Sequence, residues 1–159
     1  MTRHLHRALA LNLILTLSAL PALADAAPCP EPRPDGGQLA VTGTKLAAAH
    51  ATQVIAGGRV SLAACGRHPG AGHVTPTPDF NVLLAEGEGR ALEFRTRGDC
   101  DTVLVVVAAD GTWHYDDDGA GGHDARIRID EAPDGRYDVW VGTYDRASCR
   151  ARLILQTFP

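Results

Sequence analysis

The sequence predicts an all-β protein folded as an antiparallel β-sandwich. Short runs of β-branched and apolar residues follow one another along the chain, and Gly-Gly, Asp-Gly or Gly-x-Gly turns separate them. A chain of 159 residues that is 45% hydrophobic and 21% charged has room for one domain with one core. Many short strands with closely spaced turns are typical of two packed antiparallel sheets.

The first 26 residues have the pattern of a cleaved secretory signal. Arg3 and Arg7 form a basic start, residues 8–20 form an apolar run, and Pro21 breaks it before small residues suited to cleavage after Ala24 or Ala26. A membrane anchor is the alternative, but this run is shorter than the roughly 20 residues that span a bilayer. We therefore expect an exported protein, periplasmic or secreted, with no membrane span after cleavage.

Residues 27–37 are rich in proline and glycine, so we expect a linker or a tied-down extended arm there and a sandwich domain over residues 38–159. Residues 45–56 carry alanines that suit a short helix in their first half, which stays open, whereas their second half favours a strand. Further strands are expected at 60–62, 80–85, 91–96, 103–109, 112–115, 127–129, 137–141 and 150–156.

Period-two alternation supports these strands. Leu92 and Phe94 alternate with charged residues, the isoleucines of 126–130 alternate with arginine, and Leu153 follows the same pattern near the C-terminus. Such strands bury one face and leave the other wet. Residues 103–107 are apolar on both sides and predict a central strand.

The charge balance limits the choice of partner. Lys+Arg is 15 against Asp+Glu 19, a net charge of −4, which argues against a nucleic-acid partner because that requires a basic face. Lys45 is the only lysine. We attribute this bias toward arginine to genome composition rather than to binding chemistry.

Four cysteines, Cys29, Cys65, Cys100 and Cys149, follow the signal segment. An even number in an oxidising compartment predicts two disulfides, and a metal site would need closer pairs such as C-x-x-C. Three pairings are open on this evidence.

No catalytic constellation is evident. The two serines after the signal segment, Ser61 and Ser148, lie outside any G-x-S-x-G motif, and H-E-x-x-H is absent. The aromatic residues could form a carbohydrate-stacking platform, although packing in the core or at its rim is the commoner use of such residues. They are Trp113, Tyr115, Tyr137, Trp140 and Tyr144.

The segment 115–124 concentrates acidic residues: Asp116, Asp117 and Asp118 are consecutive and Asp124 follows a glycine-rich turn. A hard cation would offset the repulsion between these carboxylates, and calcium takes oxygen ligands from such flexible loops. The spacing does not match an EF-hand. The alternative is a metal-free loop whose aspartates accept backbone N–H bonds. Asp99 and Asp101, which flank Cys100, lie near this loop only if the strand topology brings them there.

The second half of the chain resembles the bacterial pre-peptidase C-terminal domain, in its exported proteobacterial variety. The resemblance covers about residues 78–158 and rests on the order of four motifs: G-D-C-D-T-V-L at 98–104, D-G-T-W at 110–113, D-D-D at 116–118 and G-R-Y-D-V-W-V-G-T-Y at 135–144. It implies a jelly-roll-like sandwich without an active site of its own. Relatives that bind collagen use calcium, so the resemblance supports calcium as the candidate cofactor at Asp116, Asp117, Asp118 and Asp124.

The resemblance also bears on the cysteines and on function. Cys100 and Cys149 each flank a strand of the resembling region, which favours Cys100–Cys149 and leaves Cys29–Cys65. Family members usually accompany secreted proteases; no catalytic domain precedes the region here, so we expect a free-standing binding or accessory module, with an extracellular or periplasmic protein or polymer as partner. A small secreted hydrolase, a peptidase-associated protein and a purely structural periplasmic protein are the alternatives.

Overall fold

The computed structural model describes residues 29–66 and 70–159, so the expected signal segment lies outside the described residues. Strands and two short 3₁₀ helices make up the fold. In chain order they are β1 (Gly37–Thr42), η1 (Lys45–Ala47), β2 (His50–Ala56), β3 (Val60–Ser61), η2 (Leu62–Ala64), β4 (His73–Val74), β5 (Phe80–Ala85), β6 (Ala91–Gly98), β7 (Thr102–Val107), β8 (Trp113–Asp116), β9 (Arg126–Ile129), β10 (Gly135–Thr143) and β11 (Cys149–Phe158).

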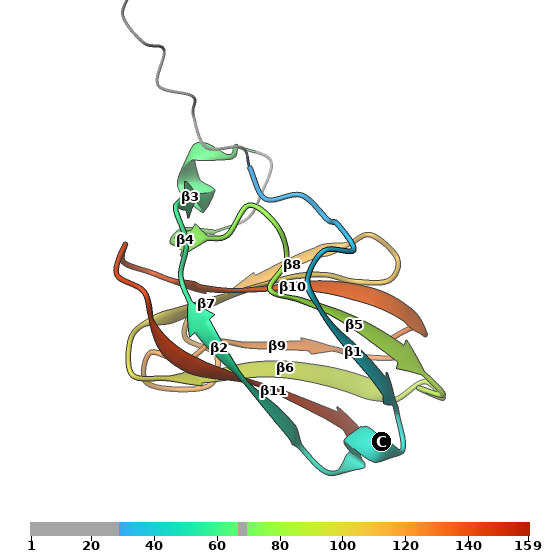
Figure 1. Ribbon diagram of the computed structural model, residues 1–159. Coiled ribbons are helices and arrows are strands. Elements are labelled where there is room, and N and C mark those ends of the chain that lie inside the picture. Colours follow the sequence, from blue (N-terminus) through green and yellow to red (C-terminus); the bar gives the residue numbers. More distant parts are fainter. Residues whose placement is uncertain (1–28, 67–69) are drawn as a thin grey trace, which may run out of the picture.

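Two sheets pack face to face, which confirms the all-β sandwich (Figure 1). One sheet has the strand order β2-β11-β6-β9, and all of its pairs are antiparallel. The other sheet is built around β10, which pairs with β5, β4 and β7, while β1, β3 and β8 extend it outward. The two sheets therefore form the two layers that the alternation of apolar and polar residues requires.

The main core lies between the sheets and is closed to solvent. Phe94, Leu153 and Leu155 from one sheet are fully buried, and they share this core with Val82 and Tyr137 from the other. The rings of Phe94 and Tyr137 lie with their centroids 5.7 Å apart. At about 1.5–3 kcal/mol for each large apolar side chain taken out of water, this packing is the main stabilising term.

A second, smaller core covers the other face of the β10 sheet. Val103, Val105 and Trp140 belong to it, and Trp113 stacks on Trp140 with ring centroids 5.6 Å apart. Because one core lies on each face, every residue of β7 is buried. The predicted central strand at 103–107 is confirmed.

Of four glycine-containing turns that separate expected strands, at 57–58, 87–89, 110–111 and 133–135, one forms a hairpin. Asp110-Gly111 does join the paired strands β7 and β8, with Gly111 at a φ of +86°. The other turns, at 57–58, 87–89 and 133–135, carry the chain from one sheet to the other. Turn residues supply the same backbone freedom in both cases, so they mark where strands end and do not reveal which strands pair.

One strand pair departs from the antiparallel expectation. β1 and β5 run parallel, with Gly37 opposite Phe80 and Thr42 opposite Ala85. β2, β3 and β4 lie between them in the chain, which supplies the long connection that parallel strands need. The second half of residues 45–56 is strand β2, as expected, and the first half, which the sequence left open, holds the short 3₁₀ helix η1.

The described part of the proline-rich segment is an arm held against the body. Cys29 is bonded to Cys65, and the Glu31 amide donates to the Pro76 carbonyl at 3.2 Å. The buried Asn81 side chain donates to the Arg33 carbonyl and accepts from the Gly36 amide, both at 2.8 Å. Of the two expected forms, linker and tied arm, the structure has the tied arm.

The expected pair of disulfides is present. Cys29 is bonded to Cys65 and Cys100 to Cys149, with no free cysteine among the described residues. This is the pairing that the family resemblance favoured. Each bond stabilises the fold by about 2–4 kcal/mol, chiefly by restricting the unfolded chain.

Asp79 makes stability depend on pH. Its Oδ2 accepts a 2.8 Å hydrogen bond from the Val141 amide, but burial outweighs that bond and raises the pKa of this carboxyl to about 7. The unfolded carboxyl titrates near pH 4, so between about pH 4 and pH 7 the folded state binds more protons and loses stability as pH rises.

We expect Asp79→Asn to remove this loss, because an amide stays neutral across the range. Urea unfolding at pH 4, 5, 6 and 7 measures the free energy of unfolding of both proteins. Between pH 4 and pH 7 the wild type should lose about 1–3 kcal/mol more of this free energy than the variant. The exposed Asp35→Asn is the control. Identical pH profiles for wild type and Asp79→Asn would contradict the assignment.

Candidate functional site

The predicted acidic residues lie at one end of the sandwich, where the loops β6–β7, β8–β9 and β10–β11 meet. The Cys100–Cys149 disulfide ties the β6–β7 loop to the start of β11. The Tyr144 amide also donates to the Asp101 carbonyl at 3.0 Å. Loops far apart in the sequence are thus held together, and Asp101 comes to lie beside the acidic β8–β9 loop.

Two of the four predicted metal ligands, Asp116 and Asp124, accept hydrogen bonds from backbone amides. Oδ2 of Asp116 accepts hydrogen bonds from the amides of Gly119, at 2.7 Å, and Arg126, at 2.8 Å. Oδ1 of Asp124 accepts from the Gly98 amide at 2.9 Å. These are the roles that the metal-free alternative assigned to the aspartates of this loop.

A buried threonine pair fixes the base of the loop. The hydroxyls of Thr96 and Thr102 lie 2.6 Å apart, and the Ala125 amide donates to the Thr96 hydroxyl at 2.8 Å. The Thr102 amide donates to the His123 carbonyl at 2.9 Å. Because these bonds tie the backbone at residues 123 and 125 to β6 and β7, those two strands set the position of His123.

Three side chains in the described residues come together as possible metal ligands: Asp101, Asp118 and His123. One ligand atom from each lies within 4.8 Å of the others, and His123 Nδ1 is 3.6 Å from Asp101 Oδ2. Asp118 and His123 are exposed, whereas Asp101 is half-buried. Of the predicted set, only Asp118 belongs to this group.

Sequence reasoning did not assign His123 to the site and left Asp101 conditional. His123 lies within the acidic segment, six residues before the end of β9. Asp101 is adjacent to Cys100, and its place beside the loop depends on strand pairing and on the disulfide. The neighbouring cysteine was therefore the signal that could have found Asp101.

Electrostatics at Asp101 reflect its crowded surroundings. Partial burial raises the pKa of its carboxyl, the nearby His123 opposes that change, and the carboxylates of Asp118, Asp117 and Asp145 add to it. Oδ1 of Asp101 is buried without a hydrogen-bond partner among the described residues. A cation bound here would relieve both effects.

The donor set suits some cations better than others. Calcium takes six to eight oxygen ligands, whereas the grouped side chains offer two carboxylates and one imidazole. Imidazole with carboxylate is typical of transition metals such as zinc or manganese. An adjoining open hollow of about 280 Å³, lined in part by Asp99 and Asp124, leaves room for water ligands.

The aromatic residues serve mainly as packing. Tyr137 and Trp140 are fully buried, and Trp113 stacks against Trp140. Burial raises the pKa of Tyr115 to about 12, with Asp117 adding to this. Only Tyr144, at 47% exposure, is a large aromatic residue that stands open among the described ones. A stacking platform of five aromatic residues is therefore not assembled.

No family model and no curated protein matches this chain. Solved structures that are similar to it include the following two. The pre-peptidase C-terminal domain of a collagenase from Bacillus anthracis has a TM-score of 0.46 and 11% identity, covering 76% of this chain and 96% of that one. A periplasmic inhibitor of g-type lysozyme from Aeromonas hydrophila has a TM-score of 0.46 and 13% identity, covering 77% and 96%. Membership of the pre-peptidase family stays a prediction from the sequence motifs.

Aspartates that accept backbone hydrogen bonds and exposed aspartates should differ in how much their loss destabilises the protein. Asp116→Ala leaves two backbone amides without their acceptor and should lower the free energy of unfolding by about 1–3 kcal/mol. Asp118→Ala removes an exposed carboxylate that makes no side-chain hydrogen bond in the described structure, so its effect should stay within about 0.5 kcal/mol. Denaturant unfolding without added metal measures both, and equal losses would contradict this division of roles.

Proposed function

We propose that this chain is an exported, non-catalytic β-sandwich module that acts by binding a protein or polymer outside the cytoplasm. The observation that supports it best is the distribution of chemical groups. Apolar side chains close the space between the sheets, whereas the ionisable clusters lie on loops and on an outer sheet face. The described residues therefore offer surfaces to a partner, and none of them encloses a water-free site for a reaction.

The serines support the same proposal. Ser61 lies opposite His73 in the β3–β4 pair, yet no hydrogen bond joins these side chains, and Ser148 is exposed in the loop before β11. A nucleophilic serine needs a base within hydrogen-bond reach. Within the described ranges, neither serine has one.

Export accounts for the covalent framework. Disulfides form and persist in oxidising compartments, and both pairs of cysteines are bonded. In the part of the chain that the structure describes, no helix is long and apolar enough to cross a membrane. The two disulfides and the signal-like first 26 residues support a protein that acts in the periplasm or beyond the cell.

Calcium at Asp116, Asp117, Asp118 and Asp124 is the part of this proposal that the loop geometry supports least. Asp116 and Asp124 each use a carboxylate oxygen for backbone amides. Asp117 and Asp118 would have to supply most of the remaining protein oxygens, with water completing the shell. In such a site the cation would steady the β8–β9 loop and offset the repulsion between its carboxylates.

A thermal melt with and without calcium tests that site. Calcium at 100 times its dissociation constant should add about 2.7 kcal/mol to stability and raise the melting temperature by several degrees. The Asp117→Ala, Asp118→Ala double variant should not respond. No shift in the wild-type protein would overturn calcium binding, and a shift with zinc or manganese alone that His123→Ala abolishes would assign the site to a transition metal.

The module itself is tested by co-sedimentation with isolated cell-envelope material, alongside a panel of chromogenic ester, peptide and glycoside substrates. We expect saturable co-sedimentation and no turnover. Hydrolysis that is lost in Ser61→Ala or Asp117→Ala would show an enzyme instead. Absence of both binding and turnover would favour the purely structural role.

A further inference from the structure

The outer face of the β2-β11-β6-β9 sheet is an array of arginines. These four strands hold six arginines and one acidic residue, Glu93, although the whole chain has a net charge of −4. The arginines are Arg95 and Arg97 on β6, Arg126 and Arg128 on β9, and Arg150 and Arg152 on β11. Their alternating neighbours are in the core, so all six point outward from it.

The strand register places like charges directly opposite one another. Arg97 faces Arg152 across the β6–β11 pair, and Arg95 faces Arg126 across the β6–β9 pair. Such pairs destabilise a sheet. Glu93 offsets part of this cost at Arg95, whereas the Arg97–Arg152 pair has no carboxylate partner among the described residues, so a bound anion would relieve its repulsion.

Most of these arginines have no internal counterion. Arg95 pairs with Glu93 at 3.0 Å, and Arg128 pairs with Asp130 at 2.9 Å while lying over the Phe158 ring. Arg97, Arg126, Arg150 and Arg152 make no ion pair with any described residue. Four guanidinium groups are therefore free to bind anions from solution.

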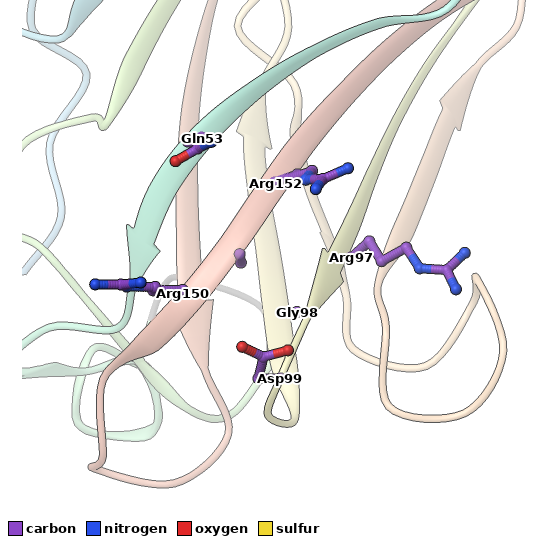
Figure 2. A pocket seen from close by; sticks show the side chains of 7 residues that line it. Gln53, Arg97, Gly98, Asp99, Arg150 and Arg152 are labelled. Atoms are coloured by element: carbon purple, nitrogen blue, oxygen red, sulfur yellow. The ribbon is translucent and has the colours of Figure 1, made fainter.

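Part of this array borders an open hollow of about 540 Å³. Arg97, Arg150 and Arg152 line it, together with Gln53 and Asp99 (Figure 2). In that view Arg97 and Arg152 extend to one side and Arg150 to the other. Positive groups thus spread along the sheet instead of converging on one point, which suits a ligand with repeated anionic groups.

The surroundings favour a polysaccharide over other polyanions. Single-stranded nucleic acid needs exposed aromatic rings for stacking, and Phe158 on this face lies under Arg128. A protein interface is usually centred on Trp, Tyr or Arg side chains in well-packed pockets. The hollow here is open, and among the described residues of this face Ile55, at 61%, is the only strongly exposed large hydrophobic one. Amides suited to sugar hydroxyls are present, since Gln53 lies opposite Arg152 and Gln156 accepts from Arg95.

We propose that this face binds a linear anionic polysaccharide, with Arg97, Arg126, Arg150 and Arg152 pairing with its carboxylate, phosphate or sulfate groups. The proposal rests on the proposed binding function and adds the ligand class and the surface. Under this proposal the arginines that the fold gathers on one sheet face serve binding, in contrast to the expectation that genome composition alone explains the arginine bias.

The experiment measures binding of purified protein to polygalacturonate and to dextran sulfate, with neutral dextran as the control polymer. We expect binding to both anionic polymers at 50 mM salt and a loss of at least about tenfold in affinity at 500 mM. Arg97→Gln with Arg152→Gln should weaken binding by about tenfold or more without lowering the melting temperature, because it removes a repulsive pair.

The matched control is Arg59→Gln with Arg146→Gln, which removes the same charge from exposed positions outside this sheet. Its affinity should stay within about twofold of wild type. Equal losses in both double variants would overturn the proposal in favour of net charge alone. Tighter binding to duplex DNA or to anionic lipid vesicles would overturn the polysaccharide class.

The envelope assay separates this inference from the proposed function. Suppose that the wild type and the Arg97→Gln, Arg152→Gln variant sediment equally with envelope material, and that neither polymer binds. The arginine face is then not the binding site, but the proposed binding function of the module stands. If envelope material and polymers both fail to bind, the proposed function fails with it.

Discussion

Burial of the facing sides of the two sheets is the constraint on which the rest of the structure depends. Phe94, Leu153 and Leu155 can leave water only if their strands present alternate residues to one side. The same geometry sends Arg95, Arg97 and Arg152 to the opposite side, toward solvent. Core and charged face are therefore two results of one register, and a one-residue slip in β6 or β11 would exchange them.

The alternation of apolar and polar residues was enough to predict most strands and the two-layer class, because it can be read within a single strand. Strand pairing could not be predicted in this way, because it depends on residues far apart in the chain. The turns at 57–58, 87–89 and 133–135 look in sequence like the hairpin turn at 110–111, yet they cross between sheets. The parallel pairing of β1 with β5 likewise depends on contacts between residues about 43 apart, which no nearby residue encodes.

The candidate site was predictable in composition but not in geometry. The acidic segment was evident in the sequence. Only the structure shows that Asp116 accepts hydrogen bonds from backbone amides, whereas Asp118 is exposed. The same holds for the arginines. Each strand showed its alternating charges in sequence, and only the order β11-β6-β9 showed that they share one surface.

The Cys100–Cys149 bond encloses β7, β8, β9 and β10 in a covalent ring. A protease that cuts any peptide bond between these two cysteines opens the ring without releasing a fragment, so the β7–β8 and β9–β10 connections are protected against loss by a single cleavage. For a protein exposed to the hydrolytic enzymes of its surroundings, nicked molecules would keep their full mass until a reductant reached the sulfurs.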